Sequence, residues 1–211
     1  MRGPVAVLVA GAVLLGACSP TTTTAALGDA LPLGSDGWYG IGLEQPMAMP
    51  DLVLTDATGR PYDLRAETAG RPALLFFGYA SCPDICPVHL SVIAQAMDQA
   101  RISTEQLSVV FVSADPARDT PELMGEYLAA FDPGFVGLTG DLDAVKSAIR
   151  SLGLPEPTYG EPDERGFYLV GHPAAVVAFD DAGQARRLYP FGTRRAQWVH
   201  DLPLLLRGES R

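Results

Sequence analysis

The stretch FFGYASCPDICPVHL, residues 76–90, holds two cysteines, Cys82 and Cys86, with three residues between them. A proline follows each one, and the chain of 211 residues contains one further cysteine, Cys18. Two thiols at this spacing can form a structural disulfide, act as a redox pair or supply two ligands to a metal ion. A disulfide across so short a loop removes little chain entropy, so the purely structural interpretation is the least favoured.

The prolines of this stretch restrict the backbone of the residue before each of them and disfavour helical conformation there. We therefore expect Cys86 at the N-cap of a helix whose first residue is Pro87. Free N–H groups and the positive end of the helix dipole would then face the Cys86 sulfur. Thiols in such a position have a lowered pKa and are better nucleophiles and better ligands.

The elements that must position these thiols begin with strands. RPALLFFGYA (71–80) and LSVVFVSAD (107–115) are continuous apolar runs, typical of strands buried on both faces. PDLVLTDATGRPYDL (50–64) predicts a hairpin, and FVGLTG (135–140) predicts a short strand. Residues 167–192 predict a strand pair that turns at Asp-Ala-Gly, positions 181–183.

Four helical patterns alternate with these strands. Residues 87–100 space their apolar side chains on one helical face. A second helix is predicted to open at Asp119-Thr120-Pro121-Glu122, which holds capping residues and an early proline, and to run to about Phe131. A third is predicted over 141–154 with Asp141 as its cap. The last, over 193–207, is expected to be interrupted or to end near Pro203.

The order of these elements predicts an α/β protein with a thioredoxin-like fold. A central mixed β-sheet flanked by helices would carry two additions, an N-terminal β-hairpin and a helix-strand-helix insertion. The length fits one domain with a sizeable core. The formal net charge of −10 argues against nucleic acid as a partner and against electrostatic docking on anionic lipid.

The chain has three histidines that could supply a third ligand beside the two thiolates. His89 would share a face with both cysteines only in a continuous helix, which the prolines disfavour. His200 falls in the last helical pattern and is expected on the surface or in packing. His172 precedes a strand, in a loop that would face the cysteine loop across a thioredoxin-like sheet. These arguments favour His172, with the other two as lesser alternatives.

The first residues have the pattern of a secretory signal. One basic residue, Arg2, precedes an apolar run too short for a membrane span, which needs about 20 residues. Leu-Gly-Ala-Cys, positions 15–18, resembles a bacterial lipobox, which implies cleavage after residue 17 and lipid on Cys18. A plain signal peptide with an incidental Cys18 is the alternative. Both interpretations predict an extracytoplasmic location, where disulfides can form.

The expected domain organisation follows from these patterns. Residues 1–17 would be a lipoprotein signal peptide, and residues 18–40 a flexible tether rich in Thr, Gly and Pro. Residues 41–208 would form the thioredoxin-like domain. The lipid would hold this domain at the cell membrane, on its periplasmic or outer face.

Four stretches together resemble the Sco/SenC family of copper proteins that serve cytochrome c oxidase assembly. They are FFGYASCPDICPVHL, VVFVSADPARDTPELMGEYLAAFDPGFVGLTG, YLVGHPAAVVAFDDAG and LYPFGTRRAQWVHDLPLLL, and they span nearly all of residues 49–207. In that family two motif cysteines and a distal histidine bind copper, which implies Cys82, Cys86 and His172 as the ligands. Two thiolates suit Cu(I), and the imidazole makes such a site acceptable to Cu(II). A three-ligand site could also take Zn(II).

The resemblance implies a membrane-anchored copper chaperone rather than an enzyme. It would deliver copper to the CuA site of cytochrome c oxidase subunit II, or reduce the cysteines of that site with Cys82 and Cys86 as a redox pair. The implied partners are that subunit or another extracytoplasmic copper protein, a thiol reductant, and the membrane through lipid on Cys18. The alternatives are a thiol–disulfide oxidoreductase without a metal role and a redox or copper sensor.

One departure from the family pattern concerns the neighbours of His172. The family usually has Asp before this histidine and Ser after it, whereas here they are Gly171 and Pro173. A carboxylate that could orient the imidazole is therefore missing. Pro173 also resembles the loop proline of thioredoxins, often cis, which keeps the thiol oxidoreductase alternative open.

Three single residues and the methionines of one short segment have simpler expected roles. Asp115, at the end of the second buried strand, would either support the site or cap the following loop, and the cap is favoured. Arg118 is expected in an ion pair of that loop, and Asp84 is expected to face solvent. The methionines of MAM, residues 47–49, could hold Cu(I) transiently, but packing ahead of the hairpin is favoured.

Overall fold

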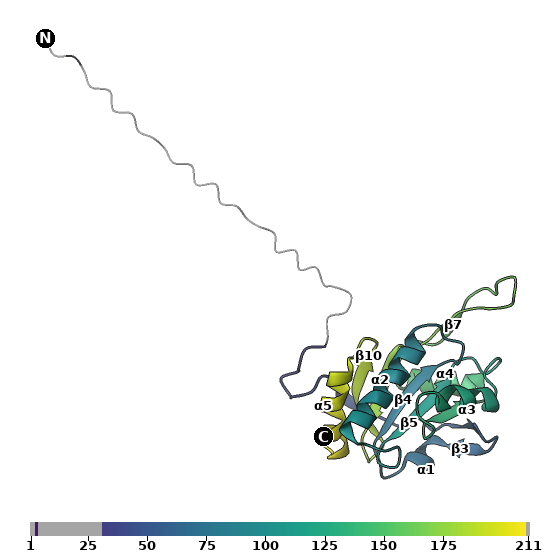
Figure 1. The fold of residues 1–211 in the computed structure, drawn as a ribbon, viewed down its shortest axis with the longest axis horizontal. Helices are drawn as coiled ribbons and strands as arrows, with labels where there is room; N and C mark the ends of the chain where they lie inside the picture. Colours follow the sequence, from purple (N-terminus) through teal and green to yellow (C-terminus); the bar gives the residue numbers. More distant parts are fainter. Residues whose placement is uncertain (1–2, 4–30, 210–211) are drawn as a thin grey trace.

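A computed structural model describes residue 3 and residues 31–209 of the chain (Figure 1). Its main sheet is mixed and eight-stranded, in the order β1-β10-β9-β4-β5-β6-β2-β3. These strands are β1 (Ile41–Ala48), β2 (Val53–Asp56), β3 (Pro61–Asp63), β4 (Ala73–Gly78), β5 (Ser108–Ser113), β6 (Val136–Thr139), β9 (Ala175–Phe179) and β10 (Gln184–Pro190). A separate two-stranded ladder joins β7 (Thr158–Tyr159) to β8 (Val170–Gly171).

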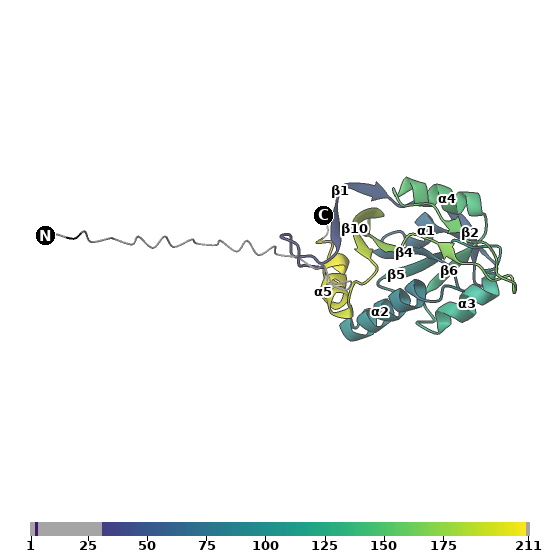
Figure 2. The ribbon, with the colours of Figure 1, turned by 90° about the horizontal axis from the view of Figure 1, so that it is seen from above.

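Helices cover both faces of the main sheet (Figure 2). One hydrophobic cluster lies beneath α2 (Ile85–Ala100), α3 (Pro121–Ala129) and α5 (Arg195–Leu206). A second cluster, on the opposite face, lies beneath α1 (Leu64–Thr68) and α4 (Leu142–Ser151). This arrangement confirms the predicted α/β, thioredoxin-like fold with a central mixed sheet.

The two apolar runs of the sequence form the centre of the sheet. Every residue of β4 and of β5 is buried, and the two strands are parallel. On its other side β4 pairs with β9 in antiparallel register, with Leu75 opposite Val177. The carboxyl end of β4 therefore lies beside the amino end of β9, and this neighbourhood positions the candidate site.

The predicted helix starts agree with the structure at two places. Thr120 caps α3 by accepting a bond from the Leu123 N–H, and Asp141 caps α4 by accepting a bond of 2.8 Å from the Ala144 N–H. The predicted break near Pro203 is wrong, because α5 continues to Leu206. Its side chains at 198, 202 and 205 are buried in the core, and this packing outweighs the one helical hydrogen bond that the proline removes.

The segment just before β1 packs against the domain. Trp38 is 4% exposed, and the N–H groups of Tyr39 and Gly40 donate to the buried carboxylate of Asp201 at 3.0 and 2.8 Å. The packed part of the chain therefore begins on the N-terminal side of residue 41. Apart from residue 3, the predicted signal peptide lies outside the described residues, as do Cys18 and the tether up to residue 30. None of the helices in the described part of the chain is long and apolar enough to cross a membrane.

Candidate metal centre

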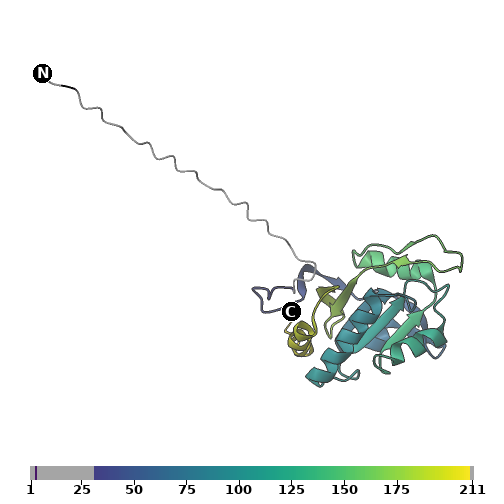
Figure 3. The same ribbon diagram turned by 45° about the horizontal axis from the view of Figure 1, so that its top comes forward.

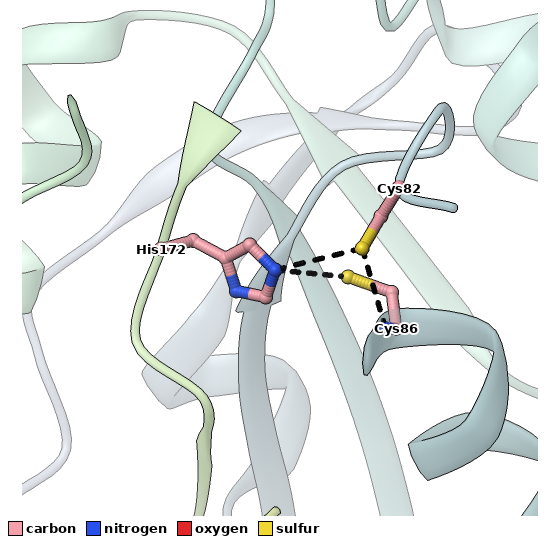
Figure 4. A group of neighbouring side chains, drawn as sticks. All are labelled: Cys82, Cys86 and His172. Atoms are coloured by element: carbon pink, nitrogen blue, oxygen red, sulfur yellow. Dashed lines mark hydrogen bonds between the residues drawn. The ribbon is translucent and has the colours of Figure 1, made fainter. Parts of the chain in front are cut away.

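Three side chains from three separate segments converge at one end of the sheet. Cys82 lies in the loop after β4, Cys86 in the first turn of α2, and His172 directly after β8. The His172 Nε2 atom lies 3.7 Å from the Cys82 Sγ and 3.4 Å from the Cys86 Sγ (Figure 4). All three candidate ligand atoms lie within 4.8 Å of one another, which is close enough for one metal ion to contact them all.

The expected N-cap position of Cys86 is wrong. Helix α2 begins at Ile85 with Asp84 as its N-cap, so Cys86 is the second helical residue and Pro87 the third. The first four N–H groups of a helix have no partner within it, so a proline at the third position removes no hydrogen bond. The Cys86 N–H instead donates to the Cys82 Sγ at 3.4 Å. The start of α2 therefore stabilises the sulfur of Cys82 by a backbone hydrogen bond, and not that of Cys86.

The two thiols are not joined by a disulfide and differ in their protonation. The hydrogen bond from the Cys86 thiol lowers the pKa of Cys82 well below its usual value, and His172 and nearby backbone N–H groups lower it further. Burial raises the pKa of Cys86, and the thiol bond that it donates to Cys82 raises it again. Cys82 is 9% exposed and Cys86 is fully buried. The metal-free centre thus pairs a thiolate, Cys82, with a more deeply buried thiol, Cys86.

The imidazole of His172 is oriented without a carboxylate. Its Nδ1 lies 3.1 Å from the Pro173 carbonyl oxygen, which accepts a hydrogen bond when that nitrogen carries the proton. The other nitrogen is then free to act as a ligand, and it faces the sulfurs. The rings of Phe76 and Tyr79 pack edge-on against the imidazole at centroid distances of 5.9 and 5.7 Å.

The two other histidines lie elsewhere, as expected. His89 is 2% exposed and packs between the rings of Phe76 and Phe191, at 5.1 and 5.4 Å. Burial lowers the pKa of His89 to about 4. His200 lies on α5, where its Nδ1 is 2.8 Å from the carboxylate of Asp201. Of the three histidines, the fold brings only His172 to the cysteines.

Several minor expectations can be compared with the structure. The Asp115 carboxylate accepts bonds from the Arg118 and Tyr168 side chains rather than from the backbone N–H groups that the favoured cap requires, so the cap is wrong. Arg118 forms the expected ion pair, and Asp84 is exposed as expected. Met49 is 4% exposed and packs in the core cluster beneath α4.

The thioredoxin-like expectation for Pro173 also meets a difference. No peptide bond among residues 31–209 is cis, so the proline before β9 is trans. The loop proline of the thioredoxin pattern is therefore not reproduced in that respect. The carbonyl of this residue instead orients the neighbouring imidazole.

Gly78 has a role in the site that no motif of the sequence indicated. A Cβ atom at this position, the last residue of β4, would lie 2.5 Å from the Cys86 Sγ and 2.5 Å from the Phe111 ring. Only a glycine leaves room there for the sulfur to sit against the sheet. A glycine at the end of a buried strand often marks such a close approach, and this signal was present in the sequence.

The fold and the three ligand atoms together define a thioredoxin-like protein with a Cys-Cys-His metal centre. The SCO1/SenC family model matches residues 43–207, and the chain belongs to the Sco/SenC family. This membership confirms the resemblance that the sequence motifs indicated.

Individual relatives agree with this membership. A Stutzerimonas stutzeri protein named for copper binding is 38% identical over 146 residues, covering 68% of this chain and 70% of its own length. The mitochondrial SCO2 protein of Saccharomyces cerevisiae is 37% identical over 135 residues. That match covers 62% of this chain but only 44% of the yeast protein.

Two solved structures are similar over most of the domain. Copper-bound ScoI of Bradyrhizobium japonicum is 30% identical, with a TM-score of 0.63, over 78% of this chain and 99% of that one. Apo Sco1 of Thermus thermophilus is 32% identical, with a TM-score of 0.67, over 80% of this chain and 96% of that one.

Proposed function

We propose that this protein is a copper chaperone. The copper ion would be bound jointly by Cys82, Cys86 and His172. The observation that carries this proposal is the position of the His172 Nε2, within 3.7 Å of both sulfurs. Two thiolates and one imidazole are a ligand set that accepts Cu(I) and also Cu(II). Relatives of this fold have been solved with copper bound, which supports copper as the cargo.

Several features of the site suit a metal that must be handed on. Three protein ligands leave a coordination position that a partner's ligand could occupy during transfer. His172 is half-buried and Cys82 is 9% exposed, whereas Cys86 is fully buried, so a partner can approach from the side of His172 and Cys82. The buried Cys86 is a thiol in the metal-free protein and must lose its proton when it becomes a ligand. Copper uptake should therefore release a proton and be favoured as the pH rises.

The client that we propose is the CuA site of cytochrome c oxidase subunit II. The function of the Sco/SenC family in oxidase assembly supports this client. The same cysteines support a second role, because the Cys82 thiolate can attack a client disulfide and Cys86 can resolve the mixed disulfide. The client would gain two electrons and two protons, and this protein would be left with a disulfide.

Copper titration of the purified protein tests the chaperone proposal. We expect one copper ion per chain, and we expect Cys82→Ser and Cys86→Ser to abolish this stoichiometric binding. Cys18→Ser is the matched control, because it removes the only other cysteine and should leave the stoichiometry unchanged. Binding that is weaker than micromolar for both Cu(I) and Cu(II) would rule out the chaperone and leave the thiol reductant.

We also propose that lipid on Cys18 anchors the protein to the outer face of a membrane. The lipobox-like residues 15–18 and the short apolar run before them support this location. Intact-mass measurement of membrane-extracted protein should find cleavage before Cys18 and the added mass of acyl chains. A mature protein that begins at another residue would contradict the anchor.

A further inference from the structure

The hairpin that carries His172 has little support of its own. Strands β7 and β8 pair at only two positions, Thr158 with Gly171 and Tyr159 with Val170. The loop between them, residues 160–169, projects from the body of the fold (Figures 1 and 3). A two-stranded ladder this short is not stable by itself in water. Contacts outside the ladder must therefore hold His172 beside the cysteines.

Arg118 makes one of these contacts, in addition to that of the Tyr159 hydroxyl of β7, which donates to the Ala114 carbonyl at 2.7 Å. The Cζ atom of its guanidinium lies 3.6 Å from the centroid of the Tyr168 ring, which belongs to the projecting loop. The Arg118 Nε donates to the carboxylate of Asp115, which is 2% exposed at the end of β5. The Tyr168 hydroxyl donates to the same carboxylate at 2.9 Å. Arg118 and Asp115 thus fasten the hairpin to the end of the central sheet.

The other side of this cluster reaches the metal centre through Tyr79. The Arg118 Cζ also lies 5.6 Å from the Tyr79 ring centroid, so the guanidinium contacts both tyrosines. The Tyr79 ring packs edge-on against the His172 imidazole, at 5.7 Å and 77°. A contiguous series of contacts therefore runs from the buried carboxylate to the third candidate ligand.

We propose that Arg118 is a positioning residue for His172, acting by its stack on Tyr168 and its contact with Tyr79. This inference rests on the proposed copper function of the site. A planar guanidinium can stack on aromatic rings while its edge binds a carboxylate, which a lysine ammonium cannot reproduce. The position before His172 is Gly171, which offers no side chain to hold the ring. The contacts of Arg118 with the two tyrosines would instead restrict the position of the His172 ring.

Three variants test this proposal. Arg118→Ala removes both the stack and the ion pair, and Arg118→Lys keeps the charge and removes the planar stack. Arg186→Ala is the matched control: the Arg186 side chain is 28% exposed and pairs with Asp180, which is 1% exposed, whereas the corresponding values for Arg118 and Asp115 are 22% and 2%. The control pair lies at the β9–β10 turn, away from the hairpin.

We expect both Arg118 variants to weaken Cu(II) binding by about tenfold, a typical effect of losing a group that orients a ligand. Cu(I) binding should change by less than about twofold, because two thiolates suffice for that ion. The nitrogen coupling in the Cu(II) spin-resonance spectrum should weaken or broaden. In the metal-free protein the Gly160 amide, which donates to the Leu169 carbonyl at 2.9 Å, should exchange faster.

The two proposals fail in distinguishable ways. Absence of copper binding in the wild-type protein would contradict the chaperone function. Wild-type Cu(II) affinity and wild-type nitrogen coupling in Arg118→Lys would overturn the stacking proposal alone. An equal loss in Arg186→Ala would also overturn it, because the effect would then reflect general stability. If Arg118→Ala does not fold, Arg118→Lys still decides the outcome.

Discussion

The Nε2 of His172 lies 3.4 Å from the Sγ of Cys86, although the two residues are 86 positions apart in the sequence. The antiparallel pairing of β4 with β9 explains this proximity. The chain enters the cysteine loop as it leaves β4, and it passes His172 shortly before it enters β9. Because the two strands run in opposite directions side by side, these two loops meet at the same edge of the sheet.

His172→Ala should separate the two oxidation states of copper. Two thiolates remain for Cu(I), whereas Cu(II) loses its only nitrogen ligand among the three candidates. We expect Cu(II) affinity to fall by about 100-fold and Cu(I) affinity to change several-fold less, judged from the known effects of altering metal ligands and their supports. Competition titrations with chelators of each ion would measure both affinities.

The control for this change is His200→Ala. His200 is half-exposed on α5 and takes no part in the centre, so both affinities should stay at wild-type values. Equal losses of Cu(I) and Cu(II) in His172→Ala would argue against the imidazole as a selective third ligand. A loss of nitrogen coupling in the His200→Ala spectrum would point to a different ligand set.

The two thiols of the metal-free protein should alkylate very differently. Iodoacetamide should modify Cys82 first, because the pKa of Cys82 is lowered and its side chain is 9% exposed, whereas Cys86 is fully buried. In Cys86→Ala the thiol donor is lost, so the pKa of Cys82 should rise toward its usual value. The modification rate of Cys82 at mildly acidic pH should therefore fall in this variant. Peptide mass spectrometry across a pH series would record it, and a pH profile identical to wild type would contradict the thiol bond.

Gly78→Ala should damage the centre without touching a ligand. The added Cβ would lie 2.5 Å from the Cys86 Sγ, so the sulfur or the strand must move. Overpacking of this kind costs about 1–3 kcal/mol of unfolding free energy. We expect lower stability in denaturant melts together with weaker binding of both copper ions. Gly125→Ala, in the middle of α3, is the control and should leave copper binding unchanged.

His89→Leu should make the protein less sensitive to acid. Burial lowers the pKa of His89 to about 4 in the folded protein, compared with 6.5 in the unfolded chain. The unfolded state therefore binds this proton more readily. The contribution of the neutral, buried His89 to the free energy of unfolding is fully present above pH 6.5 and is lost as the pH falls toward 4. This term amounts to about 3 kcal/mol across that range.

Denaturant melts between pH 7 and pH 4 would test the His89 prediction. The wild-type protein should lose more unfolding free energy over this range than His89→Leu does. His200→Ala serves again as the control, because that side chain is half-exposed. Parallel stability curves for the wild-type protein and His89→Leu would contradict the prediction.

Much of the fold could be predicted from local patterns. The continuous apolar runs predicted β4 and β5, and the capping residues Thr120 and Asp141 marked the starts of two helices. These signals are local because burial on both faces and N-cap hydrogen bonds act within one segment. The cysteine pair and the family motifs also lie in contiguous stretches, so the chemistry of the site could be predicted from the sequence.

Two helix features differ from the prediction for different reasons. Pro203 breaks no helix, because the packing of α5 on the sheet outweighs the proline's local preference. Cys86 lies inside α2 rather than at its cap, because a helix start tolerates a missing N–H at its third residue. The first outcome depends on contacts between distant segments, whereas the second is a local property of helix starts.

The residue types of the site follow from the sequence: two cysteines with a short spacing and a histidine before a buried strand. The room that Gly78 leaves for the Cys86 sulfur, and the contacts of Arg118 with Tyr168 and Tyr79, are visible only in the folded chain. Side-chain type and spacing are properties of one segment. Distances between segments depend on the order and direction of the strands in the sheet, which bring together residues that no local pattern relates.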